Sequence, residues 1–219
     1  MRELKPSPYW LRLHALTVYL FLYAPIVVLV LFSFNADRRN SGWKGFTWEW
    51  YSKLMHDELL LRALFNSVKV ACLSTLISSL LGTMAALALS RYQFRGREAV
   101  GALAYLPMMV PEVVMGIALL TFFIKMGIQL SIVTVVLAHV AFSVGYVTVT
   151  VRTRLAGLQG NLEEAAADLG ATPWTTFRLF TFPRILPGIL SGSLLAFTLS
   201  FDDFVITFFT AGVGAGTLP

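Results

Sequence analysis

Residues 126–151 read MGIQLSIVTVVLAHVAFSVGYVTVTV and contain no Asp, Glu, Lys or Arg. A helix needs roughly 20 apolar residues to cross the hydrocarbon core of a bilayer, so this stretch is long enough for one span. Open strands would leave unpaired backbone groups in lipid, and a β-barrel would show short alternating segments instead of a continuous run. The stretch therefore predicts a transmembrane α-helix.

Four more windows of the same kind lie on either side of it. The windows 13–36, 70–90 and 185–201 carry no formal charge, and the window 99–124 is broken only by Glu112. Of the 219 residues, 57% are hydrophobic and 13% are charged, whereas roughly 25% are charged in an ordinary soluble domain. A single soluble core could not hide that much apolar surface. The sequence therefore predicts an all-α polytopic membrane helix bundle with five spans.

Lys and Arg lie in the connecting segments, where they set the orientation of a membrane protein. If residues 1–12 are cytoplasmic, ten of the 17 Lys and Arg residues fall on the inner side and seven on the outer side. Because positive charge favours the cytoplasmic side, we expect the N-terminus inside, an outer loop at 37–62 and a cytoplasmic loop at 152–184. Five spans then leave the C-terminus outside. The Gly-rich turn at 212–219 indicates that a sixth span is missing from this sequence.

Three carboxylates lie inside the apolar windows, namely Glu112, Asp202 and Asp203. Each costs on the order of 3 kcal/mol on membrane insertion, so such residues tend to have a function. At a rise of about 1.5 Å per residue, Glu112 lies about 21 Å from Glu98, and Asp202 lies about 27 Å from Arg184. Both depths fall beyond the middle of the membrane, which suggests that two helices present carboxylates to one shared cavity.

Acidic side chains close to aromatic ones favour a cationic substrate. An anion pathway would instead need Arg, Lys or helix N-termini within the spans. We therefore expect Glu112, Asp202 and Asp203 to line a cation pathway, with Ser200 and Trp50 as weaker members. Neighbouring residues on a helix point about 100° apart, so the two Asp residues cannot both face a narrow site. Asp203 is favoured, because Ser200 shares its face.

Two structural interpretations stay open beside this one. Pro107 and Pro111 remove backbone hydrogen bonds close to Glu112, so this carboxylate could belong to a kink and pair with Lys125 or with a neighbouring subunit. Trp50 could belong to an aromatic belt at the membrane interface, together with the other aromatic residues of its loop, instead of the mouth of a pathway.

The expected cytoplasmic loop is patterned as two short helices. Asn161 and Glu164 fit the N-cap and the N3 carboxylate of a capping box, and Gly170 is the expected C-terminal stop. Thr172 and the proline that follows it fit the cap and the first residue of a second helix, which we expect to end at Pro183. The pair could dock into a partner's groove, or it could be an ordinary amphipathic surface helix.

The same loop resembles the EAA motif of ABC importer permeases. That motif reads Glu-Ala-Ala, three residues, Gly, nine residues, then Ile-x-Leu-Pro. Here Glu164, Ala165 and Ala166 are followed by Gly170 and by Phe-Thr-Phe-Pro at 180–183, so Phe replaces the usual Ile and Leu. The resemblance implies the type I ABC importer permease fold. It also places Glu164, Ala165, Ala166 and Gly170 in the helix that couples to an ATPase subunit.

Three further stretches, 161–172, 197–203 and 217–219, are similar to the polyamine (spermidine/putrescine) branch of that family. The resemblance implies a transmembrane permease domain over 13–219, in a bacterial inner-membrane subunit that translocates putrescine or spermidine. It also implies a second permease subunit in a heterodimer, a dimeric nucleotide-binding ATPase and a periplasmic substrate-binding protein. ATP and Mg would act on the ATPase, and this chain would carry no cofactor. Members of the family continue past the final Leu-Pro into a sixth helix.

The sequence lacks motifs for chemistry of its own. It contains no G-x-x-x-x-G-K-[ST], no H-E-x-x-H and no G-x-S-x-G, and Cys72 is its single cysteine. His139 is interpreted as a packing or hydrogen-bonding group. We therefore expect a transport subunit that is not an enzyme and binds no metal. The alternatives are an ABC permease for another small cation, a proton-coupled secondary transporter, which would usually show inverted repeats, and a cation channel, which would not need the two-helix loop.

Overall fold

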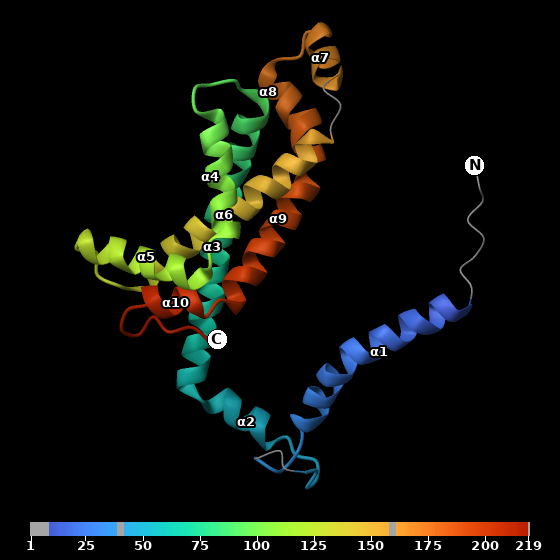
Figure 1. Cartoon of the computed structure of the whole chain (residues 1–219), viewed down its shortest axis with the longest axis vertical. Coiled ribbons are helices and arrows are strands. Elements are labelled where there is room, and N and C mark those ends of the chain that lie inside the picture. Colours follow the sequence, from blue (N-terminus) through green and yellow to red (C-terminus); the bar gives the residue numbers. More distant parts are fainter. Residues whose placement is uncertain (1–8, 39–41, 158–160, 219) are drawn as a thin grey trace. The chain divides into compact units, whose positions relative to one another are not determined.

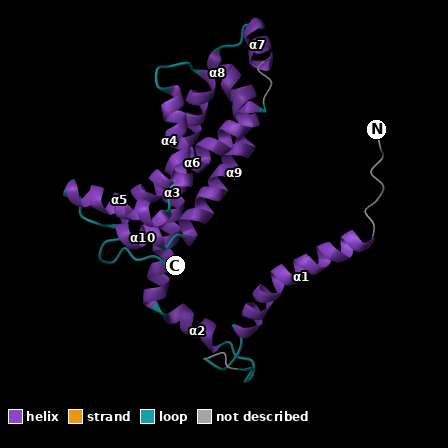
Figure 2. Cartoon of the chain, in the orientation of Figure 1, coloured by secondary structure: helices purple, strands orange, loops and turns teal. Residues whose placement is uncertain are grey.

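The computed structural model describes residues 9–38, 42–157 and 161–218, except for the side chains of residues 161–164. Within these ranges the chain consists of helices and loops, with one isolated antiparallel bridge between Asn35 and Phe46 (Figure 2). The predicted all-α class is therefore confirmed. The chain divides into two compact units, residues 1–61 and 62–219, and each is described by itself.

The first unit contains helix α1 (Tyr9–Phe32) and the short helix α2 (Glu49–His56). Residues 9–31 of α1 are all exposed although most are apolar, as expected of a helix whose surroundings are lipid or a partner helix. The loop after α1 is organised by Asn35, which is 1% exposed. The Asn35 side-chain amide donates to the Gly42 carbonyl at 2.7 Å, and its carbonyl oxygen accepts from the Lys44 N–H at 2.9 Å.

The second unit holds most of helix α3 and the helices that follow it. The bounds are α3 (Glu58–Arg91), α4 (Arg97–Met109), α5 (Glu112–Lys125), α6 (Ile132–Ala156), α7 (Asn161–Asp168), α8 (Pro173–Thr176), the π-helical stretch η1 (Phe177–Thr181), α9 (Phe182–Asp202) and α10 (Val205–Thr210). Within this unit, α7 and α8 lie at one end and α5 and α10 at the other (Figure 1). The loop helices are therefore separated from α5 and α10 by the length of the bundle.

Helix α6 is the centre of the second unit and packs against α4, α9 and α10. Small residues let the neighbouring helices approach it closely. On α9 they recur every four residues, at Gly188, Gly192, Ala196 and Ser200, and all of these are buried. On α3 a Cβ added at Gly82 would lie 2.7 Å from the Cβ of Val147 on α6. Backbone-to-backbone packing of this kind is typical of membrane helices.

Four described helical stretches are long and apolar enough to cross a membrane. They are Tyr9–Phe32, Glu58–Arg91, Ile132–Ala156 and Pro173–Asp202, and the bent pair α4 and α5 could supply a fifth. Each stretch overlaps one of the predicted windows, although its bounds differ. The prediction of several apolar spans is therefore confirmed, with the window 99–124 as the irregular member.

The window 99–124 is broken more sharply than the sequence indicated, because α4 and α5 meet at an angle of 112°. Val110 is extended (φ −80°, ψ 133°) and Pro111 precedes the first residue of α5. A residue before proline avoids the helical region, so the helix stops at Met109 and restarts at Glu112. Helix α5 then packs against α10, and Glu112 lies at the corner.

The segment between α6 and α9 confirms two of the predicted signals and corrects a third. Gly170 has φ of +80°, as a left-handed helix end requires, and the Thr172 hydroxyl accepts from the Thr175 N–H at 3.3 Å. Pro183 does not end the second helix, because helical structure runs from Pro173 to Asp202. The Phe182 N–H bonds to the carbonyl five residues earlier, and this wider turn carries the helix past the proline. The predicted capping box at Asn161 and Glu164 lies outside the described side chains.

Candidate functional site

One cavity in the second unit is lined by all three of the membrane carboxylates. Its volume is about 250 Å³, and it lies where α5 begins, α9 ends and α10 begins. The lining residues are Glu112, Thr198, Leu199, Asp202, Asp203, Phe204 and Val205. The bend before α5 brings Glu112 to the end of α9, although the two elements are far apart in sequence.

Glu112 and Asp202 are exposed at this cavity. Among the described residues, neither carboxylate has a hydrogen-bonding or ion-pairing partner, and the described lining contains no Lys, Arg or His. Lys125 lies at the opposite end of α5 from Glu112, so it is not the partner that the structural interpretation invoked. The cavity therefore offers negative charge to whatever enters it.

Asp203 is in the opposite situation, with 8% of its surface exposed. Its carboxylate accepts the backbone N–H groups of Ile206 at 3.3 Å and Thr207 at 3.0 Å, and also the Thr207 hydroxyl at 3.3 Å. The His139 Nε2 lies 3.3 Å from the same carboxylate. Asp203 therefore caps the start of α10 and pairs with a histidine of α6.

Ser200 belongs to the same buried network and does not line the cavity. Its hydroxyl lies 2.6 Å from the Nδ1 of His139 and 3.0 Å from the hydroxyl of Ser74 on α3. His139 is 1% exposed and Ser200 is 4% exposed. The interpretation of His139 as a hydrogen-bonding group is confirmed.

These contacts reverse the sequence-based preference for Asp203 over Asp202. Asp203 and Ser200 do share one face, but that face points into the protein, whereas Asp202 is exposed at the cavity. Sequence reasoning also missed Thr198 in the lining and Thr207 in the network. The spacing of Asp203 and Thr207 was a usable signal, because an acid just before a new helix commonly caps it.

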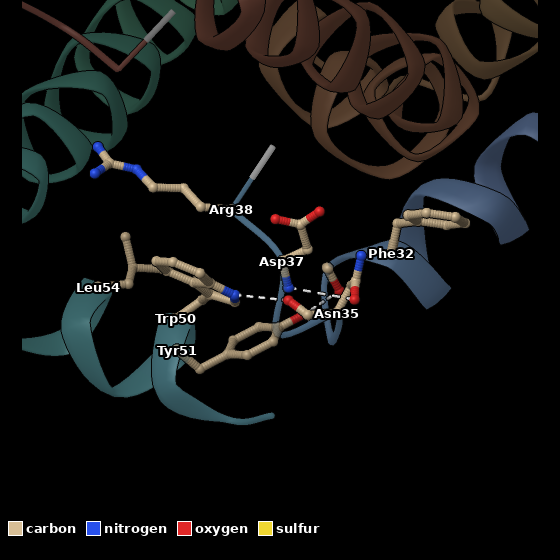
Figure 3. Close-up of a pocket in the computed structure, with 8 residues that line it drawn as sticks. Phe32, Asn35, Asp37, Arg38, Trp50, Tyr51 and Leu54 are labelled. Carbon is tan, nitrogen blue, oxygen red and sulfur yellow. Dashed lines mark hydrogen bonds between the residues drawn. The ribbon is translucent and has the colours of Figure 1, made fainter. Parts of the chain in front are cut away.

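Trp50 lies in the first unit, in a separate pocket of about 490 Å³. Its indole Nε1–H donates to the Asn35 carbonyl at 2.9 Å, and the Lys53 Nζ lies 4.8 Å from the ring centre. Figure 3 shows the ring of Trp50 beside Tyr51, with the carboxylate of Asp37 across the pocket. All the residues that line the pocket of Trp50 belong to the first unit, whereas the three carboxylates belong to the second.

The residues of the EAA-like loop form one end of the second unit (Figure 1). Ala165 and Gly170 are exposed, Ala166 is 5% exposed, and the side chain of Glu164 lies outside the description. Two large apolar side chains that the sequence reading passed over are exposed here, Leu169 at 89% and Trp174 at 69%. Apolar side chains displayed in this way are common at protein interfaces.

Residues 78–219 match the family described as "Binding-protein-dependent transport system inner membrane component". The chain belongs to this family. It is therefore a multi-pass inner-membrane component of an ABC import system and not an enzyme, which answers the alternatives of a secondary transporter and a channel. Among the described residues, no group of three or more His, Cys, Asp or Glu side chains could hold a metal ion.

Relatives of this family member are similar over nearly its whole length. The spermidine/putrescine transport system permease protein PotC of Haemophilus influenzae is 44% identical over 202 residues, which cover 92% of this chain and 79% of that protein. PotC of Escherichia coli is 41% identical, with 92% and 76% covered. The putrescine transport system permease protein PotI of Escherichia coli is 40% identical, with 96% and 77% covered.

Solved structures confirm the predicted type I ABC importer permease fold. A chain of a bacterial ABC transporter involved in the import of the acidic polysaccharide alginate has a TM-score of 0.76 at 15% identity, with 98% of this chain and 80% of that chain covered. A chain of the inward-facing MetNI methionine ABC transporter has a TM-score of 0.62 at 18% identity, with 75% and 78% covered. At these identities the likeness shows the fold alone.

Proposed function

We propose that this chain is a permease subunit that carries polyamines, putrescine or spermidine, inward across the membrane. The observation that supports this most is the cavity at the α5, α9 and α10 junction, where the carboxylates of Glu112 and Asp202 are exposed and have no partner among the described residues. Three relatives at 40–44% identity are named as permeases of putrescine or spermidine systems.

The chemistry of the cavity suits a flexible chain with a positive charge at each end. Two carboxylates without protein partners can replace the water that an alkylammonium group loses on entering the bundle. Phe204 adds an aromatic surface, which attracts cations, and Thr198 adds a hydroxyl acceptor. Because the described lining lacks Lys, Arg and His, an anionic substrate would meet two carboxylates there and no cationic side chain.

The proposal includes partners that the family context supports. The segment from α7 to α8 docks on a nucleotide-binding ATPase, with Leu169 and Trp174 as apolar anchors beside Ala165, Ala166 and Gly170. ATP and Mg bind to that ATPase. A second permease subunit and a periplasmic substrate-binding protein complete the system, and the N-terminus of this chain is cytoplasmic.

The test replaces each cavity acid by its amide, which keeps the size and removes the charge. Glu112→Gln and Asp202→Asn, assayed for uptake of labelled putrescine and spermidine in cells that carry the complete system, should each raise the KM at least about tenfold. That factor corresponds to losing one charge-assisted contact. Glu98→Gln is the matched control, because Glu98 is a first-turn acid of α4 outside this cavity, as Glu112 is a first-turn acid of α5. Wild-type uptake by both amide variants, at normal membrane levels, would contradict the proposal.

A further inference from the structure

A buried polar network joins four helices next to the cavity. It runs from Ser74 on α3 through Ser200 on α9 and His139 on α6 to Thr207 on α10 and to Asp203, which links α9 to α10. The contacts are 3.0 Å between the two serine hydroxyls, 2.6 Å from Ser200 to Nδ1, and 3.0 and 3.3 Å from Nε2 to Thr207 and Asp203. Each member is at most 8% exposed. Buried polar groups are costly in a membrane, so a connected set calls for an explanation.

The carboxylate of Asp203 determines which ring nitrogen of His139 carries the proton. An ionised carboxylate only accepts hydrogen bonds, so the Nε2 of His139 carries a proton and points it toward Asp203 and Thr207. In the neutral ring, Nδ1 then accepts from the Ser200 hydroxyl. Both ring nitrogens of His139 are therefore hydrogen-bonded, and its Nε2–H donates toward Asp203.

The network lies at the point where α9 stops being a helix. Asp203 is extended (φ −74°, ψ 119°) and follows the last residue of α9. Its carboxylate holds the first turn of α10 through the backbone N–H groups of Ile206 and Thr207. Asp202, one residue earlier, is exposed at the cavity. Fixing the conformation of Asp203 therefore also fixes the direction in which Asp202 leaves the helix.

We propose that His139 is a positioning residue, which holds Asp203 at the break between α9 and α10 so that the carboxylate of Asp202 faces the cavity. This inference rests on the proposed role of Asp202 in transport. His139 itself has 1% of its surface exposed and is not part of the cavity lining, so it acts through Asp203 and does not touch the substrate.

The first test measures uptake kinetics in His139→Ala and His139→Gln. Loss of a hydrogen bond to a charged group should raise the KM for polyamine about tenfold in His139→Ala, with a smaller change in the maximal rate. Gln can keep one donor for Asp203 and one acceptor for Ser200, so His139→Gln should recover most of the affinity. A fall in maximal rate alone, with an unchanged KM, overturns the proposal.

Two less disruptive variants distinguish loss of the network from a general loss of helix packing. Ser74→Ala removes the outer member of the network, while Ser79→Ala removes another serine pair between the same two helices, from Ser79 to Ser193 at 2.6 Å. Ser74→Ala should raise the KM about two- to fivefold, as expected for a neutral hydrogen bond, and Ser79→Ala should not. Equal effects of the two variants would mean that the serines serve only helix packing, and the proposal would be wrong.

The exposure of residue 202 at the cavity can be measured by thiol labelling, without a transport assay. In a Cys72→Ala background, Asp202→Cys should react with a small cationic thiol reagent in isolated complexes, and adding His139→Ala should change that rate about tenfold. An unchanged rate overturns the inference. If Asp202→Asn itself transports normally, the proposed role of Asp202 in transport fails instead, whatever the labelling shows.

Discussion

Asp202 and Asp203 are neighbours in the chain and lie in opposite surroundings. Asp202 is exposed and without a partner among the described residues, whereas Asp203 accepts from two backbone N–H groups and a hydroxyl and pairs with His139. The same substitution should therefore affect a different property at each position, namely stability at Asp203 and uptake at Asp202. One carboxylate is available to a ligand, and the other is part of the folded core.

Asp203→Asn should lower the free energy of unfolding by about 3 kcal/mol, because removing one partner of a buried pair leaves the other without compensation. Asp202→Asn should leave stability unchanged and affect only uptake. The midpoint of thermal unfolding in detergent measures the difference, with the amount of assembled complex as a second readout. Equal midpoints for the two variants would disprove this division of roles.

The site was partly readable from the residues alone. A carboxylate within an apolar window stands out, so Glu112, Asp202 and Asp203 could be found without a structure. Which Asp faces the cavity could not be found, because that depends on where α9 stops, and the break is stabilised by His139, which lies more than sixty residues earlier. Ser200 was predicted to line the pathway because it shares a helical face with Asp203. Its helical face was identified correctly, but the partners of that face come from other elements.

The helices of the second unit approach one another through glycines, and this makes a packing test possible. A Cβ at Gly145 on α6 would overlap the carbonyl oxygen of Ala104 on α4, whereas a Cβ at Gly101 on α4 would lie 3.6 Å from a nitrogen of Arg152. Gly145→Ala should therefore destabilise the protein by about 1–3 kcal/mol, as overpacking does. Gly101→Ala should be neutral or slightly stabilising, because alanine favours helix. The measurement is the midpoint of thermal unfolding in detergent. Equal midpoints for Gly145→Ala and Gly101→Ala would show that α4 and α6 are not closely packed.

The turn after α7 gives a test of the docking segment. Gly170 has φ of +80°, where a β-branched side chain costs about 1–2 kcal/mol. Gly170→Val should therefore distort the segment that presents Leu169 and uncouple ATP hydrolysis from uptake, while the chain still inserts. Gly157→Ala is the control, since Gly157 has φ of −82° at the end of α6. The measurement is the ratio of ATP hydrolysed to polyamine taken up in proteoliposomes, and an unchanged ratio in Gly170→Val argues against the docking role.

Signals that act through a single residue predicted the helix boundaries better than signals whose outcome depends on packing. Gly170 and Thr172 act through their own backbone or side chain, so their roles follow from the residue type. Pro183 was expected to end a helix, but the single wide turn at 177–181 accommodates it. The bend at Pro111 was expected as a kink, yet its size reflects the packing of α5 against α10, which no local pattern encodes.

At the scale of the whole molecule, the orientation in the membrane follows from the distribution of Lys and Arg. We expect the loop at 92–96 inside and the region of α2 outside. In a Cys72→Ala background, Met55→Cys should react with a membrane-impermeant thiol reagent in intact spheroplasts, because Met55 is 71% exposed. Arg95→Cys should react only after permeabilisation. The reverse pattern would show that the chain inserts the other way round.

The unbroken helical stretch from Pro173 to Asp202 has a mechanical consequence. It contains 30 residues, so it is a rod about 45 Å long. One end carries the exposed Trp174 and the other carries the cavity acid Asp202. If the rod and the helices hydrogen-bonded to it tilt together by about 10° around the Trp174 end, the far end moves by about 8 Å, which is more than one helical turn of rise. The displacement of Asp202 grows in proportion to the length of the helix. A small tilt imposed on the α7–α8 end by a bound partner is therefore enough to move Asp202 by the width of a small cation.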